Sequence, residues 1–238
     1  MKKILVITLF LFGVSIYAQR HIEKTVDYNN QEIDIEVPFA FNITVKNWDK
    51  STIQLEADLT MDEEEFLDLY ELNITEQKSL ITIESNAKPV FKAFQEKYGE
   101  KRSEDGKTIY VNCCHIEYEF NYTLYIPKNA NFKISSINGS ITSKSIEGDF
   151  TADLINGDIN IADYKGKMDL STINGEIDLK LINTSIVAET IHGNIYADEA
   201  IKLTSEDRMI GQKVKGETKN PLNTLKLKTI NGNLYLRI

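Results

Sequence analysis

The chain has 238 residues, of which 42% are hydrophobic and 26% charged, proportions typical of a folded globular protein that exclude wholesale disorder. Its 27 Lys and Arg are outnumbered by 36 Asp and Glu, and this net charge of −9 argues against binding to nucleic acid or to an anionic lipid surface. With only 3 His and 2 Cys, the composition also argues against a multi-histidine metal site or a framework of disulfides.

Residues 1–19 have the pattern of a secretory signal peptide. Lys2 and Lys3 precede an apolar run over residues 4–16, and Ala18 offers a small side chain at a cleavage point. The run is shorter than the ~20 apolar residues that cross a bilayer, although an uncleaved N-terminal anchor is the alternative. The sequence therefore predicts an exported protein, periplasmic, outer-envelope or extracellular, with no membrane span after cleavage.

Residues 20–135 are predicted to form an N-terminal β-rich cap that continues into the first rungs of a repeat. Alternating apolar and polar residues predict strands at 32–37, 39–45, 52–57, 72–74, 80–83 and 118–126. The one predicted helix covers residues 61–70, because Thr60 and Glu63 have the spacing of a capping box. The charged segment 86–112 is predicted to be an extended surface insertion.

The adjacent residues Cys113, Cys114 and His115 are the one cluster that carries metal-ligand or redox chemistry. They are weak candidates for a metal site, because neighbouring residues of a strand point to opposite faces and only His21 and His192 remain as further histidine ligands. Free thiols or a vicinal disulfide are the favoured alternatives in an exported protein. We therefore expect no cofactor and no metal.

Residues 136–238 contain a repeat of eighteen residues that predicts the fold. Its corner motif is a polar residue followed by glycine, and the first four glycines are evenly spaced. The motif occurs at Asn138-Gly139, Asn156-Gly157, Asn174-Gly175, His192-Gly193 and, after an insertion, Asn231-Gly232. Glycine also falls midway between these corners at Gly148 and Gly166. Such corners favour the positive φ angles that glycine and asparagine adopt.

Columns of isoleucine flank these corners. Ile137, Ile155, Ile173 and Ile191 precede the glycines by two residues, and Ile141, Ile159, Ile177 and Ile195 follow them by two. Period-two alternation within the repeat predicts rungs of two short strands, with both columns pointing inward and the rungs ~4.8 Å apart. The predicted fold class is all-β, a parallel β-solenoid (β-helix). The asparagine column is predicted to be structural, by its turn chemistry.

Two other solenoids and the common catalytic motifs do not match the sequence. The glycines are single, unlike a calcium-binding nonapeptide repeat, and a period of six is absent. No nucleophile elbow, Ser-x-x-Lys, His-Glu-x-x-His or phosphate-binding loop occurs. Asp158 and Asp178 resemble the acid pairs of solenoid enzymes that cleave polysaccharides, but a solvated charged face is the favoured interpretation. The sequence therefore predicts a protein that is not an enzyme.

The chain resembles a bacterial family of exported putative adhesins, of unknown function, with a β-solenoid body. The resemblance rests on the signal peptide, the turn at Val45-Lys46-Asn47-Trp48-Asp49-Lys50, the step at Tyr125-Ile126-Pro127-Lys128-Asn129-Ala130, and the Asn-Gly rungs after it. It covers most of the mature chain and implies a protein of the envelope or surface without known catalysis. The insertion at 86–112 and the adjacent cysteines depart from the family pattern.

Three functions follow as hypotheses. The first is an adhesin-like binding or scaffold module that contacts an unknown protein or glycan at the cell envelope through the polar faces of its strands. The second is an envelope-stress sensor or a regulatory partner of a membrane protein, acting through residues 86–117. The third and least favoured is a polysaccharide hydrolase or lyase.

Overall fold

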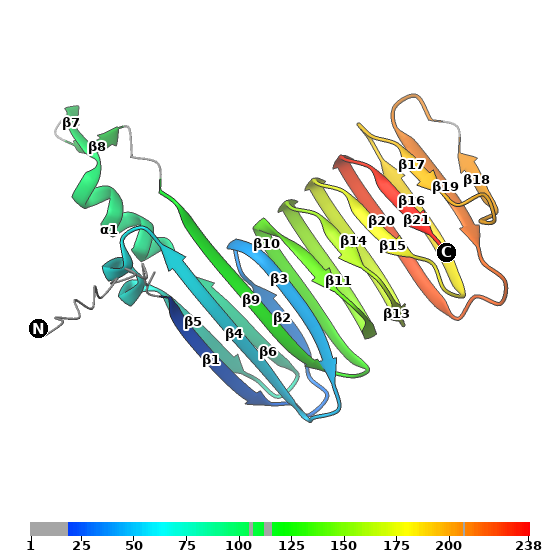
Figure 1. The fold of residues 1–238 in the computed structure, drawn as a ribbon, viewed down its shortest axis with the longest axis horizontal. Coiled ribbons are helices and arrows are strands. Elements are labelled where there is room, and N and C mark those ends of the chain that lie inside the picture. The colour runs from blue at the N-terminus through cyan, green and yellow to red at the C-terminus, as the bar shows by residue number, and fades with distance from the viewer. Residues whose placement is uncertain (1–18, 105–106, 112–115, 207) are drawn as a thin grey trace, which may run out of the picture.

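The computed structural model describes residues 19–104, 107–111, 116–206 and 208–238. The predicted signal peptide and the cluster Cys113, Cys114 and His115 lie outside the described residues. The described chain is an all-β protein whose strands lie side by side along the longest axis of the molecule, from β1 and β5 near one end to β18 and β19 at the other (Figure 1). The predicted all-β class is confirmed.

The first half of the chain supplies strands to one end of this stack. They are β1 (Arg20–Asp27), β2 (Glu32–Glu36), β3 (Phe39–Trp48), β4 (Thr52–Met61), β5 (Glu71–Glu76), β6 (Leu80–Asn86) and β9 (Tyr118–Pro127). Between them lie the 3-10 helix η1 (Glu64–Leu69), the α-helix α1 (Lys88–Tyr98), and the hairpin of β7 (Glu100–Glu104) and β8 (Lys107–Val111). None of the helices in the described part of the chain combines the length and apolarity needed to cross a bilayer.

The second half continues the stack with strands of 2 to 14 residues. They are β10 (Ala130–Ser143), β11 (Ile146–Asn156), β12 (Ile159–Ile161), β13 (Tyr164–Lys165), β14 (Lys167–Asn174), β15 (Ile177–Lys180), β16 (Thr184–Thr190), β17 (Ile195–Ala197), β18 (Leu203–Glu206), β19 (Gln212–Glu217), β20 (Asn223–Asn231) and β21 (Leu234–Arg237).

The pairings form two series of strands that β10 joins. The first series runs β5, β6, β2, the first half of β10, β11, β14, β20, β16, β19 and β18. The second series runs β1, β4, β9, β3, the second half of β10, β12, β15, β21 and β17. Pairing is parallel in the middle, antiparallel at the N-terminal end of both series and antiparallel at the C-terminal end of the first series only, so the sheet is mixed rather than purely parallel.

Residues eighteen apart form the core of the repeat. Phe132 pairs with Phe150, and their rings stack 4.5 Å apart; Phe150 in turn pairs with Met168. The column two residues further on, Ile134, Ala152 and Leu170, is completely buried. Each Å² of apolar surface that such columns remove from water stabilises the fold by ~25 cal/mol. A single rung cannot bury these side chains by itself, so the rungs must stack.

The last strands of the chain interrupt the order that the repeat predicts. β20 pairs in parallel with β14 on one side and with β16 on the other, and β21 likewise lies between β15 and β17. The corner at Gly232 therefore lies between those at Gly175 and Gly193, although it comes last in the sequence. Figure 1 shows the red C-terminal strands inside the yellow part of the stack.

Two local predictions in the first half are wrong. Thr60 and Met61 belong to β4, and the helical turn that follows is the shorter 3-10 helix η1, whose N-cap Glu63 makes no capping hydrogen bond. The segment 86–112 is not an extended insertion, because it contains α1 and the β7–β8 hairpin. α1 buries Val90 and Phe94, one helical turn apart, against the core.

The predicted inward direction of the first isoleucine column is also wrong. Ile137, Ile155 and Ile173 are 43%, 41% and 39% exposed, whereas the column after the glycines is buried at Ile141, Ile159 and Ile177. The reason is the alternation itself. Phe150, Ala152 and Leu154 point inward on β11, so Ile155, at the opposite parity, points outward.

Candidate interaction surface

The predicted corner residues form a continuous column of hydrogen-bonded side chains. Asn156 donates from Nδ2 to Asn138 Oδ1 at 3.0 Å, and Asn174 donates in the same way to Asn156 at 2.8 Å. Asn231 continues the column by donating to Asn174 at 2.8 Å. His192 occupies the last corner, where its backbone N–H donates to the Ile230 carbonyl.

The glycines of these corners are required by backbone contact. Gly139 has a φ of +110°, and a Cβ on Gly157 would lie 2.2 Å from the carbonyl oxygen of Gly139. The same contact recurs at Gly175, Gly232 and Gly193, whose Cβ positions lie against the carbonyl of the preceding corner in the stack. The corners thus approach one another too closely to accommodate a side chain at the glycine position. This close approach fixes the register of the strands that follow the corners.

A second polar column lies next to the corner on the outer side of the second series. The backbone N–H of Asp158 donates to Ser140 Oγ at 3.1 Å, and that of Glu176 donates to Asp158 Oδ1 at 2.8 Å. Asn233 Nδ2 donates to Glu176 Oε1 at 2.9 Å, and the Asn194 N–H donates to Asn233 Oδ1 at 3.0 Å. These hydrogen bonds fix the positions of the polar side chains along the outer side of the second series.

Two tyrosines are the last members of the neighbouring column of the second series, which lies two residues after the polar column in each strand. Tyr235 and Tyr196 pair across β21 and β17, and their rings stack with centroids 5.3 Å apart and planes 13° from parallel. The Tyr235 hydroxyl donates to Glu176 Oε1 at 3.3 Å, and Asn194 Nδ2 donates to the Tyr196 hydroxyl at 3.4 Å. Tyr196 is 51% exposed and lies on the last strand that pairs in the second series of the described residues.

We call the group of the exposed Tyr196, Asn194 and Glu176 with the partly buried Tyr235 and Asn233 the tyrosine patch. It combines two flat apolar rings with side-chain amides and one carboxylate, so it offers stacking together with hydrogen-bond donors and acceptors. Gln212 reaches it from β19, since its Nε2 lies 3.5 Å from Asn194 Oδ1. Three strands, β17, β19 and β21, and the corner before β15 therefore contribute to one surface.

The acid pair considered for catalysis is engaged in structural contacts. Asp178 Oδ2 binds Arg237 Nη2 at 2.5 Å, and Asp158 Oδ1 accepts the backbone N–H of Glu176. An acid and base that act on a glycosidic bond need one carboxyl group with a raised pKa and free access to the substrate oxygen. Both carboxylates are instead held by groups of the protein itself.

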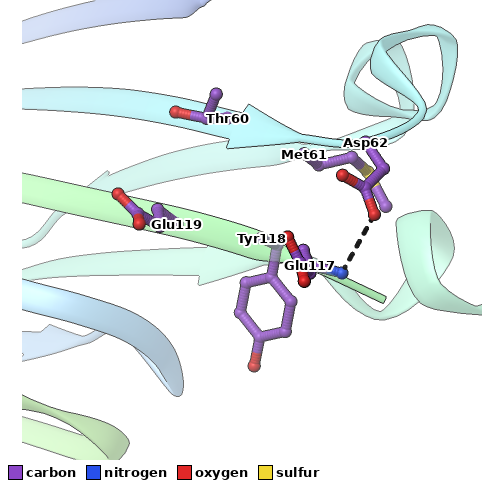
Figure 2. Close-up of a pocket in the computed structure, with 6 residues that line it drawn as sticks. All are labelled: Thr60, Met61, Asp62, Glu117, Tyr118 and Glu119. Carbon is purple, nitrogen blue, oxygen red and sulfur yellow. Dashed lines mark hydrogen bonds between the residues drawn. The ribbon is translucent and has the colours of Figure 1, made fainter. Parts of the chain in front are cut away.

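A hollow of about 280 Å³ lies in the N-terminal half of the stack, where β4 ends and β9 begins. Figure 2 shows Thr60 and Met61 on one strand, Tyr118 and Glu119 on the next, and the Tyr118 ring directed away from Asp62. The Glu117 backbone N–H donates to Asp62 Oδ2 at 3.4 Å. The three acids of the lining have no cation among the other lining residues, and no cluster in the described part of the chain has the ligands of a metal site.

His21 is placed far from the repeat. Its Nδ1 lies 2.8 Å from Asp58 Oδ1 on the neighbouring strand β4, and this hydrogen bond raises the pKa of His21 above its ordinary value. The structure therefore does not bring His21 and His192 together. The stacking of the two patch tyrosines depends on the placement of β21 beside β17, which the spacing of the repeat does not predict.

Comparison with known proteins gives a fold and no more. No family model matches the sequence, and no curated protein matches it. Among solved structures, a putative cell adhesion protein from Clostridium sporogenes aligns over 92% of this chain and 99% of its own, with a TM-score of 0.56 and 11% identity. The chain shares this fold.

Two further solved structures are similar over most of their length. A putative adhesin from Bacteroides fragilis has 9% identity and a TM-score of 0.34, covering 92% of this chain and 98% of its own. A putative adhesin from Parabacteroides merdae has 10% identity and a TM-score of 0.29, covering 92% and 95%. Scores this low add nothing to the argument from the first structure.

Proposed function

We propose that this chain is a non-enzymatic, exported, adhesin-like module that binds a saccharide at the cell envelope through the tyrosine patch. The observation that supports it most directly is the stacked pair of the half-exposed Tyr196 and the partly buried Tyr235, with its rim of amides and a carboxylate. Sugar rings present apolar C–H faces and outward hydroxyls, which match an aromatic plane beside fixed donors and acceptors. The fold that this chain shares with a putative cell adhesion protein also supports an adhesin-like role.

The body that carries this patch is, in our interpretation, a β-solenoid. Three successive parts of one rung pair in parallel with residues eighteen positions later: Phe150 with Met168, Ile159 with Ile177, and Ile146 with Tyr164. A chain that advances one strand spacing with every rung produces this pattern. Such a body is long and rigid and holds its outer side chains at fixed intervals.

The test is a glycan-binding screen of the mature chain, followed by affinity measurements with the best saccharide. Tyr196→Ala removes the exposed ring, and we expect it to weaken binding at least about tenfold, the range in which single aromatic anchors act. Phe41→Ala is the matched control, because Phe41 is 52% exposed and lies on β3. Equal binding by Tyr196→Ala and the parent chain, or no saccharide bound at all, would refute the proposal.

Location and lack of catalysis are tested separately. Protease treatment of intact cells, read with an antibody to the mature chain, should remove the protein if it lies on the surface and spare it in the periplasm. Turnover of a polyuronate that disappears in Asp158→Asn or Asp178→Asn would contradict the non-enzymatic proposal.

A regulatory partner at the other end of the molecule is the second candidate. The hairpin of β7 and β8 forms its own two-stranded sheet and projects from α1 away from the stack (Figure 1). A projecting hairpin outside the main sheet favours contact with another protein. Crosslinking in cells with and without residues 100–111 tests this candidate, which fails if the same partners are recovered from both chains.

A further inference from the structure

A row of outward-facing isoleucines runs along the outer side of the first series, beside the asparagine column. The pairing of the strands orders its members as Ile137, Ile155, Ile173, Ile230 and Ile191. The first three are about 40% exposed and the other two partly exposed. We call these five side chains the isoleucine row.

The row is unusual because its positions are accessible to solvent, so polar side chains would be accommodated there. Each member lies between an inward residue and a solvated corner, as Ile173 lies between the buried Thr172 and the exposed Asn174. Five aliphatic side chains ~4.8 Å apart form a strip of ~20 Å. Contiguous exposed apolar strips with polar borders are typical of protein interfaces.

The charged column beside the row is arranged about the centre of the row. Two residues before each isoleucine stand, in the order of the stack, Ser135, Asp153, Ser171, Lys228 and Glu189. Asp153 and Lys228 therefore flank the central position, Ile173, at one strand spacing on either side. Opposite charges at equal distances from a centre are complementary to a second copy of the same surface in the reverse direction.

We propose that the isoleucine row is the interface of an antiparallel homodimer whose two-fold axis passes through Ile173. This axis places Ile173 against its own copy, Ile155 against Ile230, and Ile137 against Ile191, so all five members are covered. It also places Asp153 opposite Lys228 of the second copy, twice. The closed symmetry prevents growth into a fibre.

The neighbouring columns are compatible with this arrangement. Asn156 and Asn174 each use one N–H and one acceptor site along the stack, which leaves a second N–H for the other copy. On the far side of the charged column, Asp169 meets its own copy, but Lys226 neutralises it at 2.7 Å. The interface uses the first series, so the tyrosine patch on the second series stays exposed in both copies.

The first test is crosslinking in a chain whose native cysteines are replaced, Cys113→Ser and Cys114→Ser. Ile173→Cys should form an intermolecular disulfide with itself under mild oxidation. Ile155→Cys and Ile230→Cys should crosslink efficiently only when the two variants are mixed. Phe41→Cys, which is exposed to a similar extent elsewhere, is the control and should stay monomeric.

The second test is the mass of the unmodified mature chain by sedimentation or light scattering over a range of concentrations. We expect a dimer that Ile173→Asp weakens at least about tenfold without loss of the β-sheet circular dichroism signal, because the site is exposed. Lys228→Asp should weaken the dimer, and Asp153→Lys with Lys228→Asp should restore it. Asp153 also forms an ion pair with Lys133 of its own chain at 3.0 Å, which Asp153→Lys removes. The melting temperature of the monomeric variant measures the stability lost in this way, separately from the strength of the dimer.

A monomer at all concentrations, a dimer unaffected by Ile173→Asp, or an Ile173→Cys chain that crosslinks no better than Phe41→Cys would each overturn the proposal. A monomer would leave the row for a different partner. None of these outcomes bears on saccharide binding by the tyrosine patch, so the two proposals fail independently.

Discussion

The hydrogen bond between Tyr164 and Thr184 allows a quantitative test of how the repeat and the last strands are joined. Both side chains are buried, and the two hydroxyl oxygens are 2.6 Å apart. Thr184 Oγ1 donates its own hydrogen to the Ile182 carbonyl at 2.7 Å, so the Tyr164 hydroxyl is the donor between them. Thr184→Val keeps the side-chain volume but removes the acceptor of Tyr164.

An orphaned buried hydroxyl costs about 1–3 kcal/mol, so we expect Thr184→Val to lower the free energy of unfolding by about 2 kcal/mol. The Ile182 carbonyl is not orphaned, because Asn223 Nδ2 also donates to it at 2.8 Å. Tyr164→Phe removes one satisfied bond and should cost about 1 kcal/mol. With no orphan left, the double variant should be less destabilised than the sum, by about 1 kcal/mol or more.

The assay is urea unfolding of the mature chain, followed by circular dichroism and tyrosine fluorescence, with coincident transitions as the condition for comparing free energies. Burial raises the pKa of Tyr164 to about 12, whereas an unfolded tyrosine ionises near pH 10. Because the unfolded state loses its proton first, this tyrosine's stabilisation is complete below pH ~10 and is lost as the pH rises to ~12. Additive single substitutions, or a Tyr164→Phe chain with the alkaline pH dependence of the parent, would refute the reasoning.

Three shorter predictions test other parts of the stack. Gly175→Ala should destabilise the fold by about 1–3 kcal/mol or more in urea unfolding, because its Cβ would lie 2.0 Å from the Gly157 carbonyl oxygen. The imidazole of His21 should titrate above its ordinary value in NMR and return towards it in Asp58→Asn. Its stabilisation is complete below the unfolded pKa and lost as the pH rises through the folded one, and an unchanged titration would contradict this pairing. Deletion of residues 223–238 should abolish amide protection in β16 and β17 while β11 and β12 keep theirs, and protection that persists in β16 would show that it closes directly on β14.

Six strands of the first half could be predicted from alternation, since β2, β3, β4, β5, β6 and β9 match the expected segments, β2 to within one residue, whereas β1, β7 and β8 were not predicted. α1 was missed because the high charge of its segment concealed a helical pattern. Val90, Phe94 and Tyr98 are spaced by four residues, and Pro89 stands in the first turn, where proline is tolerated. The four-residue spacing by itself predicts a helix that packs on the core, whatever the charge of the segment.

The isoleucine row was misassigned for a different reason. The identity of the column across repeats predicts a core position, although strand parity places Ile155 opposite in direction to Ala152 and Leu154. Parity is decided over a few residues of one strand and is stronger evidence than similarity between repeats, because a shift of one residue reverses every side chain. Repetition shows that a position matters and leaves open whether the core or a partner requires it.

The placement of β20 could not be predicted, because the local pattern permits two arrangements. The corners at Gly175 and Gly193 are spaced by eighteen residues, so direct pairing of β14 with β16 satisfies the repeat equally well. The structure interposes β20, and Thr229 and Thr190 then both donate to glycine carbonyls of neighbouring corners, at 3.0 and 2.9 Å. The same hydroxyl contact links Thr172 to the Gly157 carbonyl. Because the same hydroxyl contact forms at each of these corners, the local residues do not select between the two orders, and the tyrosine patch depends on the pairing of β21 with β17, a contact between distant residues.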